Sequence, residues 1–146
     1  MGNQLISDVI LTPLKIIEMD DGNVMHGMKK EDPGADGFGE AYFSFVGYQK
    51  IKAWKKHKEM TLNLVVPFGE IQFVLYDDRN ASPTKNSFFS VSLCRKNYQR
   101  LTVPPGVWMG FKGLGRSENC LLNLANIPHD PAEGERCALE QIPFNW

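Results

Sequence analysis

Residues 101–111 read Leu-Thr-Val-Pro-Pro-Gly-Val-Trp-Met-Gly-Phe, an apolar run, a Pro-Pro-Gly turn and an apolar return run. Proline fixes φ at the first position of a tight turn, and glycine tolerates the positive φ that can follow. The stretch therefore predicts two antiparallel strands joined by a short turn. By itself it predicts a hairpin and nothing about function.

The same punctuation extends along the whole chain. Pro and Gly recur at short intervals, the apolar runs between them have the length of strands, and no segment shows a sustained helical stripe. We expect strands at residues 9–17, 40–46, 50–56, 61–66, 70–76, 88–93, 99–103, 108–113 and 119–125. This spacing predicts a single all-β domain over residues 1–146, an antiparallel β-sandwich or jelly-roll barrel.

Composition limits the class of protein. The chain has 146 residues, enough for one domain with a real core, and a net charge of −1. A near-neutral balance argues against nucleic acid as the main partner. The N-terminus has neither a basic region nor a long apolar run, and the three cysteines show no metal-ligand spacing. We expect a cytoplasmic protein with reduced thiols and no membrane contact.

Two segments stand outside the regular strands. Residues 28–39, rich in charge, Gly and Pro, are expected to form a flexible loop or a lid over one end of the barrel. Residues 128–146 are expected to form a tail that begins with a short turn near Asp130. The tail ends in bulky apolar residues, so we expect it to dock on the barrel.

The richest stretch for chemistry is residues 50–59, where five lysines and His57 surround one strand. Strict alternation puts Ala53, Lys55 and His57 on one face and Lys52 with Trp54 on the other. If the first face lines the barrel, neighbouring cations lower the pKa of Lys55 and His57, and either could act as a base near neutral pH. The alternative is a solvated basic edge strand that blocks unwanted pairing.

The ordered set of motifs resembles a cupin. A strand with His57, a glycine turn at residues 66–70 and a Pro-x-Gly turn leading into a further strand occur in the order typical of that fold. Metal-binding cupins use a His-x-His pair, a glutamate and a late histidine. Here Lys55 stands at the first histidine position and Met109 at the late one. We therefore expect no catalytic metal and no other cofactor.

Several stretches resemble the dTDP-4-dehydrorhamnose 3,5-epimerase family of metal-free cupins, over about three quarters of the chain. They are residues 38–44 (FGEAYFS), 51–54 (IKAW), 75–79 (LYDDR), 103–106 (VPPG) and 130–136. The resemblance implies an enzyme that moves protons next to a ketone. In the family, a histidine of an Arg-Gly-x-His motif is the base, a lysine stabilises the enolate, a late tyrosine is the acid, and a carboxylate supports the base.

Carried over residue by residue, the motif arginine becomes Lys52 and the base position becomes Lys55, with His57 two residues further on. Lys58 is the best match for the assisting lysine. The late tyrosine is missing, so His129 is the nearest proton donor. The C-terminal segment shows no clear counterpart of the supporting carboxylate.

Other polar and aromatic side chains are weaker candidates for substrate binding. Arginine binds phosphate through two parallel hydrogen bonds, and aromatic rings stack on sugars or bases. The candidates are Tyr76, Arg79, Tyr98, Arg100 and Trp108, together with Lys52 at the position of the motif arginine. Each could equally be structural.

The leading hypothesis is an epimerase or isomerase of a nucleotide-linked 4-keto-6-deoxy sugar in cell-surface polysaccharide (for example lipopolysaccharide) biosynthesis. His57 and Lys55 would be its proton-transfer pair and Lys58 its enolate stabiliser. A noncatalytic cupin that binds a sugar nucleotide or saccharide is the alternative, and a metal-dependent cupin oxygenase or isomerase is a third reading. We expect a homodimer, because pairing removes exposed strand edges.

Overall fold

The computed structural model describes residues 3–146, and nearly all of its regular structure is β-strand. The strands are β1 (Ile10–Pro13), β2 (Ile16–Ile17), β3 (Val24–Met25), β4 (Glu40–Val46), β5 (Ile51–His57), β6 (Leu62–Phe68), β7 (Ile71–Asp77), β8 (Phe88–Leu93), β9 (Gln99–Val103), β10 (Val107–Gly113), β11 (Asn119–Ala125) and β12 (Gly134–Arg136). Two single-turn 3-10 helices, η1 (Pro131–Glu133) and η2 (Leu139–Gln141), lie near the C-terminus. Neither described helix is long and apolar enough to cross a membrane.

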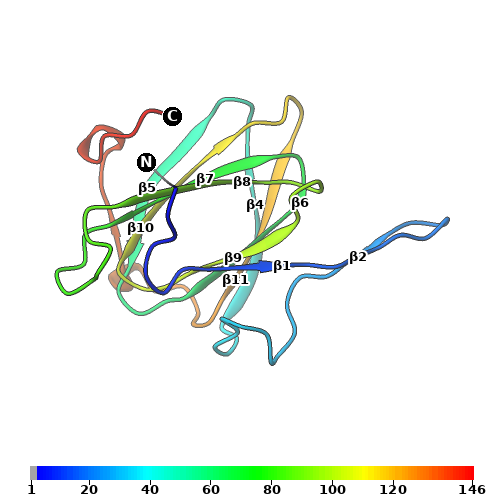
Figure 1. Ribbon diagram of the computed structural model, residues 1–146, viewed down its shortest axis with the longest axis horizontal. Coiled ribbons are helices and arrows are strands. Elements are labelled where there is room, and N and C mark those ends of the chain that lie inside the picture. The colour runs from blue at the N-terminus through cyan, green and yellow to red at the C-terminus, as the bar shows by residue number, and fades with distance from the viewer. Residues whose placement is uncertain (1–2) are drawn as a thin grey trace.

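Two five-stranded antiparallel sheets form a sandwich (Figure 1). The first sheet has the order β1-β9-β6-β11-β4, and the second has the order β12-β5-β10-β7-β8. The expected all-β sandwich is therefore confirmed, and the expected strands match the observed ones within a few residues. The exception is residues 9–17, where β1 ends at Pro13 because proline has no N–H for the ladder. The chain then forms the β2-β3 hairpin, which projects from the body (Figure 1).

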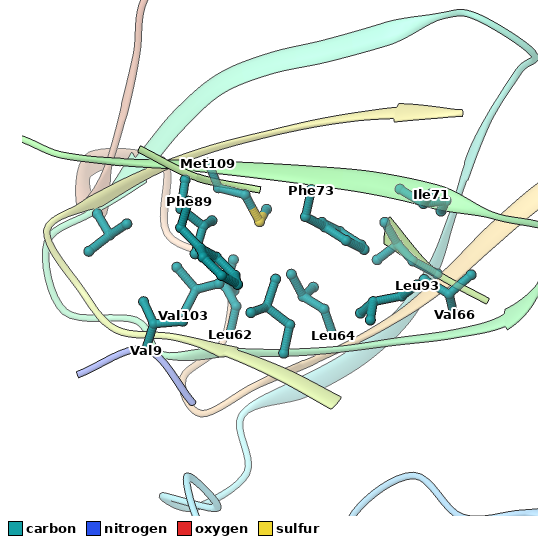
Figure 2. Packing of buried hydrophobic residues seen from close by; sticks show 14 of the residues in the cluster. Val9, Leu62, Leu64, Val66, Ile71, Phe73, Phe89, Leu93, Val103 and Met109 are labelled. Carbon is teal, nitrogen blue, oxygen red and sulfur yellow. The ribbon is translucent and has the colours of Figure 1, made fainter. Parts of the chain in front are cut away.

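The core lies between the sheets. Figure 2 shows Leu62 and Leu64 of the first sheet pointing toward Phe73 and Met109 of the second. These side chains are at most 8% exposed, which is the burial that the alternating strand pattern predicts. Leu62, Leu64 and Met109 also line a cavity between the sheets, together with several polar side chains.

Residues 28–39 are fixed to the outer face of the first sheet. The buried Arg100 donates hydrogen bonds to the carbonyls of Gly27 and Pro33, and Asn63 donates to the carbonyl of Gly34. None of residues 28–39 lines the cavity between the sheets. The buried guanidinium needs carbonyl acceptors and this loop provides them, whereas a lid over one end of the barrel stays a prediction.

The tail covers the outer face of the second sheet. Its Phe144 and Trp146 pack against Phe88 and Trp54, with ring centroids 5.4 Å apart in both pairs. Ile142 is 7% exposed within this cluster. Aromatic side chains of the tail thus cover part of the outer face of the second sheet.

Candidate active site

A cavity of about 510 Å³ opens between the two sheets. Strands β5, β10 and β12 form one wall, and strands β4, β6 and β11 form the opposite wall. Its volume is in the range of small-molecule sites. The polar lining residues are Tyr42, Ser44, Lys52, Lys55, His57, Asn123 and Arg136.

An irregularity in β5 decides which lysines reach the cavity. Met109 pairs with Lys55, but Phe111, two residues on, pairs with Lys52, so three residues of β5 oppose two of β10. Such a bulge breaks the alternation of faces. Lys52 and Lys55 therefore both line the cavity, whereas strict alternation had predicted that Lys52 faces away. The Lys52 ammonium also donates to the carbonyl of Phe45 at 2.7 Å.

His57 is paired with a carboxylate. Its Nδ1 lies 2.6 Å from Oε1 of Glu133, and the two residues are 8% and 7% exposed. The other carboxylate oxygen accepts hydrogen bonds from the backbone N–H groups of Glu59 and Met60, at 3.0 and 2.9 Å. Because an ionised carboxylate only accepts, Nδ1 carries the proton and Nε2 keeps its lone pair.

The charge states agree with this assignment. Burial raises the pKa of Glu133, but the hydrogen bonds from Glu59, His57 and Met60 lower it to about 2. The pKa of His57 is lowered, mainly by burial and also by the charges of Lys55 and His129, while Glu133 opposes this shift. At neutral pH the pair is a carboxylate beside a neutral imidazole, which is the form of a general base.

Glu133 was missed by the sequence reasoning. Residues 130–136 were expected to contain only a short turn, and that turn is present as η1, with the Asp130 side chain accepting from the N–H of Ala132. The turn holds Glu133 against His57, although the two are 76 positions apart. Nothing local in the sequence marks this contact, because a glutamate in a capped turn is usually solvated.

Two cations lie beside the base. Lys55 pairs in register with Arg136 of β12, and both side chains line the cavity. The pKa of Lys55 is lowered by burial and by the charge of Arg136, and Glu133 and Glu40 partly offset this. Arg136 had no assigned role from the sequence. Together the two cations make this end of the cavity attractive to an anion.

An adjoining hollow of about 320 Å³ lies on the same side as His57. His129 lines it together with Lys55, His57, Glu133 and Arg136. The structure therefore brings three of the four candidate catalytic residues together. Lys58, the fourth, is exposed and lines neither space.

Most of the candidate binding residues lie elsewhere. Tyr76 and Trp108 belong to the outer cluster of the second sheet, where the Trp108 indole donates to Asp78 at 2.9 Å. Arg79 binds Asp77 and Asp8, and Tyr98 donates to the carbonyl of His26. Arg100 is fully buried among the residues of the first sheet and its covering loop. Among the six binding candidates, only Lys52 lines the cavity.

The opposite wall holds a polar pair that the sequence did not single out. Tyr42 and Asn123 are cross-strand partners on the inner faces of β4 and β11, and the Asn123 amide donates to the Tyr42 hydroxyl at 3.0 Å. Over residues 3–146, no cluster of three or more His, Cys, Asp or Glu side chains is placed to hold a metal ion.

Comparisons with known proteins give consistent matches. A solved dTDP sugar isomerase from Desulfovibrio desulfuricans G20 is 40% identical, with a TM-score of 0.93 over 97% of this chain and 92% of that one. A dTDP-4-dehydrorhamnose 3,5-epimerase from Bacillus anthracis, solved with TDP and pyrophosphate, shares the fold at 19% identity, with a TM-score of 0.84 over 96% and 85% of the two chains.

Two curated relatives are each 29% identical. A probable low-salt glycan biosynthesis epimerase of Haloferax volcanii matches over 106 residues, 72% of this chain and 66% of that protein's length. The spore coat polysaccharide biosynthesis protein SpsL of Bacillus subtilis matches over 113 residues, 75% of each chain. No family model matches the sequence.

Proposed function

The chain belongs to the dTDP-4-dehydrorhamnose 3,5-epimerase-like family of dTDP-sugar isomerases, and on this premise we propose that it epimerises or isomerises a nucleotide-linked 4-keto-6-deoxy sugar. The observation that carries the proposal is the buried His57–Glu133 pair at the wall of a ligand-sized cavity. A neutral imidazole with a free Nε2 can remove a proton from carbon. Relatives named for glycan and spore coat polysaccharide biosynthesis support a role in making cell-surface sugars.

The chemistry needs a base and a group that stabilises negative charge. The ketone at C4 acidifies the C–H bonds at C3 and C5, so Nε2 of His57 takes a proton and the electron pair moves onto the C4 oxygen. The Lys55 ammonium lies on the same wall and stabilises that enolate oxygen. Lys55 thus takes the role first assigned to Lys58, which is exposed outside the cavity.

Arg136 and Lys52 suit the diphosphate of the nucleotide. Both line the cavity, and Arg136 also borders the adjoining hollow. Guanidinium binds phosphate oxygens through two parallel hydrogen bonds, and a lysine contributes a point charge. Solved proteins of this fold hold TDP with pyrophosphate, dTDP or dTDP-4-keto-L-rhamnose, which is the ligand chemistry that we assign to this cavity.

The noncatalytic alternative rested on the replacement of the family's base by Lys55. His57 with Glu133 provides a base two residues along the same strand, so that argument loses its force. The absence of cofactor and metal and a cytoplasmic location stay predictions from the sequence.

We also propose a homodimer. Phe43 and Phe45 on the outer face of edge strand β4 are 65% and 52% exposed, and nearby Phe38 is 69% exposed. Such an apolar patch on an edge strand favours association. Light scattering should give twice the chain mass, and Phe43→Ser with Phe45→Ser should halve it. A monomeric mass for the unaltered protein would contradict the proposal.

The test of the activity is proton NMR with dTDP-4-keto-6-deoxyglucose in deuterated buffer. Deuterium should enter C3 or C5 of the sugar, and His57→Asn should abolish this entry, while His26→Asn should leave it unchanged. Line broadening of the ligand without exchange would support the binding protein instead. Neither effect would mean that this nucleotide sugar is the wrong ligand.

A further inference from the structure

The pair Tyr42 and Asn123 is the polar feature of the cavity that the base and the cations leave unused. The two residues lie in register on β4 and β11, and both line the cavity. The wall that they form belongs to the first sheet, whereas His57 and Lys55 belong to the second. A sugar bound between the sheets therefore has the base on one side and Tyr42 on the other.

The hydrogen bond within the pair leaves a donor for the ligand. Asn123 donates its amide to the Tyr42 oxygen at 3.0 Å, so the phenol accepts this bond and its own O–H remains to donate. No other hydrogen bond of Tyr42 occurs within residues 3–146. Burial, with a smaller contribution from Glu40, raises the pKa of Tyr42, so the phenol keeps its proton at neutral pH.

Asn123 itself is incompletely satisfied. It is 5% exposed, and its Oδ1 has no hydrogen-bond partner among the described residues. A buried acceptor without a partner costs free energy unless a ligand or water supplies a donor. A sugar hydroxyl in the cavity is such a donor, and its binding would set the ring beside the phenol.

The other tyrosines are used elsewhere. Tyr48 lies under the guanidinium of Arg116, Tyr76 packs on the outer face of the second sheet, and Tyr98 donates to His26. His129, the donor expected from the sequence, lies in the hollow on the same side as His57. An acid beside the base cannot deliver a proton to the opposite face of the ring.

We propose that Tyr42 is the acid that returns a proton to the sugar carbon from the face opposite His57, with Asn123 as its positioning residue. The inference rests on the proposed function. His57 Nε2 removes the proton from carbon, and the enolate forms at the C4 oxygen. As the C4 carbonyl re-forms, the carbon takes the phenol proton. Solvent then restores the proton to the phenolate and removes the one held by His57.

The test separates proton removal from proton return. In deuterated buffer, Tyr42→Phe should keep deuterium entry into the starting sugar, because His57 still forms the enolate and returns a solvent deuteron from its own side. The rate of product formation should fall by about 100-fold or more, the usual contribution of a general acid. Tyr48→Phe, at a tyrosine of similar exposure outside the cavity, should match the unaltered protein in both rates.

Four outcomes are informative. Product formation at an unchanged rate in Tyr42→Phe overturns the proposal, and so does equal loss of exchange and product formation in a folded variant, which indicates substrate positioning. If His129→Asn loses product formation while Tyr42→Phe forms product at the unaltered rate, the acid is His129 and the proposal is overturned. If the unaltered protein shows no exchange, the proposed function fails, and that failure is distinct from the failure of Tyr42.

Discussion

Nδ1 of His57 lies 2.6 Å from Oε1 of Glu133, and this contact joins the last residue of β5 to the turn before β12. The same carboxylate accepts hydrogen bonds from two backbone N–H groups, those of Glu59 and Met60, in the segment that follows β5. The two backbone hydrogen bonds fix the carboxylate, and its hydrogen bond with Nδ1 then holds the imidazole in one tautomer and one orientation. A base so fixed loses little entropy when substrate binds.

Replacement of Glu133 tests this pair. In Glu133→Gln we expect deuterium exchange to slow by about 100-fold, because a neutral amide no longer favours the tautomer with a free Nε2. The pKa of His57 should fall further, since Glu133 raises it in the unaltered protein. Histidine NMR titration measures the pKa of His57, and the exchange assay measures the rate. Glu135→Gln, at an exposed position two residues along, is the control; equal rates in the two variants would contradict the role of Glu133.

Lys55, near the end of β5, and Lys58, just beyond it, allow a matched comparison of a lysine inside the cavity with one outside it. Lys55→Met should slow exchange by about 100- to 1000-fold, the cost of removing one group that stabilises an oxyanion. Lys58→Met should leave the rate unchanged, because Lys58 is exposed outside the cavity. Initial rates at saturating substrate measure the effect, and circular dichroism checks the fold. A large loss in Lys58→Met would restore the original assignment.

The pH dependence of exchange follows from the charges around His57. The imidazole must be neutral to act as a base, so the rate should rise with pH through a midpoint below the ordinary histidine pKa of 6.5 and then level off. Burial lowers this pKa, Lys55 and His129 lower it further, and Glu133 opposes them. In Lys55→Met the midpoint should therefore move up. A midpoint at or above 6.5 in the unaltered protein would argue against His57 as the base.

We expect Arg100 to contribute to the stability of the fold and not to substrate binding. It is fully buried and donates to Asn63, to two loop carbonyls and to Asp32. Arg100→Met should lower the free energy of unfolding by about 3 kcal/mol, because those acceptors lose their partner. Urea denaturation measures this loss, and the exposed Arg116→Met should change stability by less than about 0.5 kcal/mol. A raised KM with unchanged stability would instead place Arg100 at the substrate.

The prediction of the fold succeeded because its signals are local. Alternation of apolar residues and Pro-Gly turns depend on neighbours a few positions apart, so the strands from β4 to β11 lie where the sequence predicts them. Pro13 was read as part of a longer strand, although its missing N–H ends β1 there. The presence of His57 and Lys55 at the site followed from the same local pattern.

What the sequence determined by itself was the all-β architecture, the approximate bounds of strands β4 to β11 and a basic strand with one histidine. Only the tertiary structure decided which of these side chains contact one another and which of them reach the cavity. Glu133 reaches His57 across 76 positions, Asn123 reaches Tyr42 across 81, and a bulge in β5 turns Lys52 toward the cavity. Strand periodicity fixes which residues can share a face, but the register between distant strands, set by packing of the whole sandwich, fixes which of them meet.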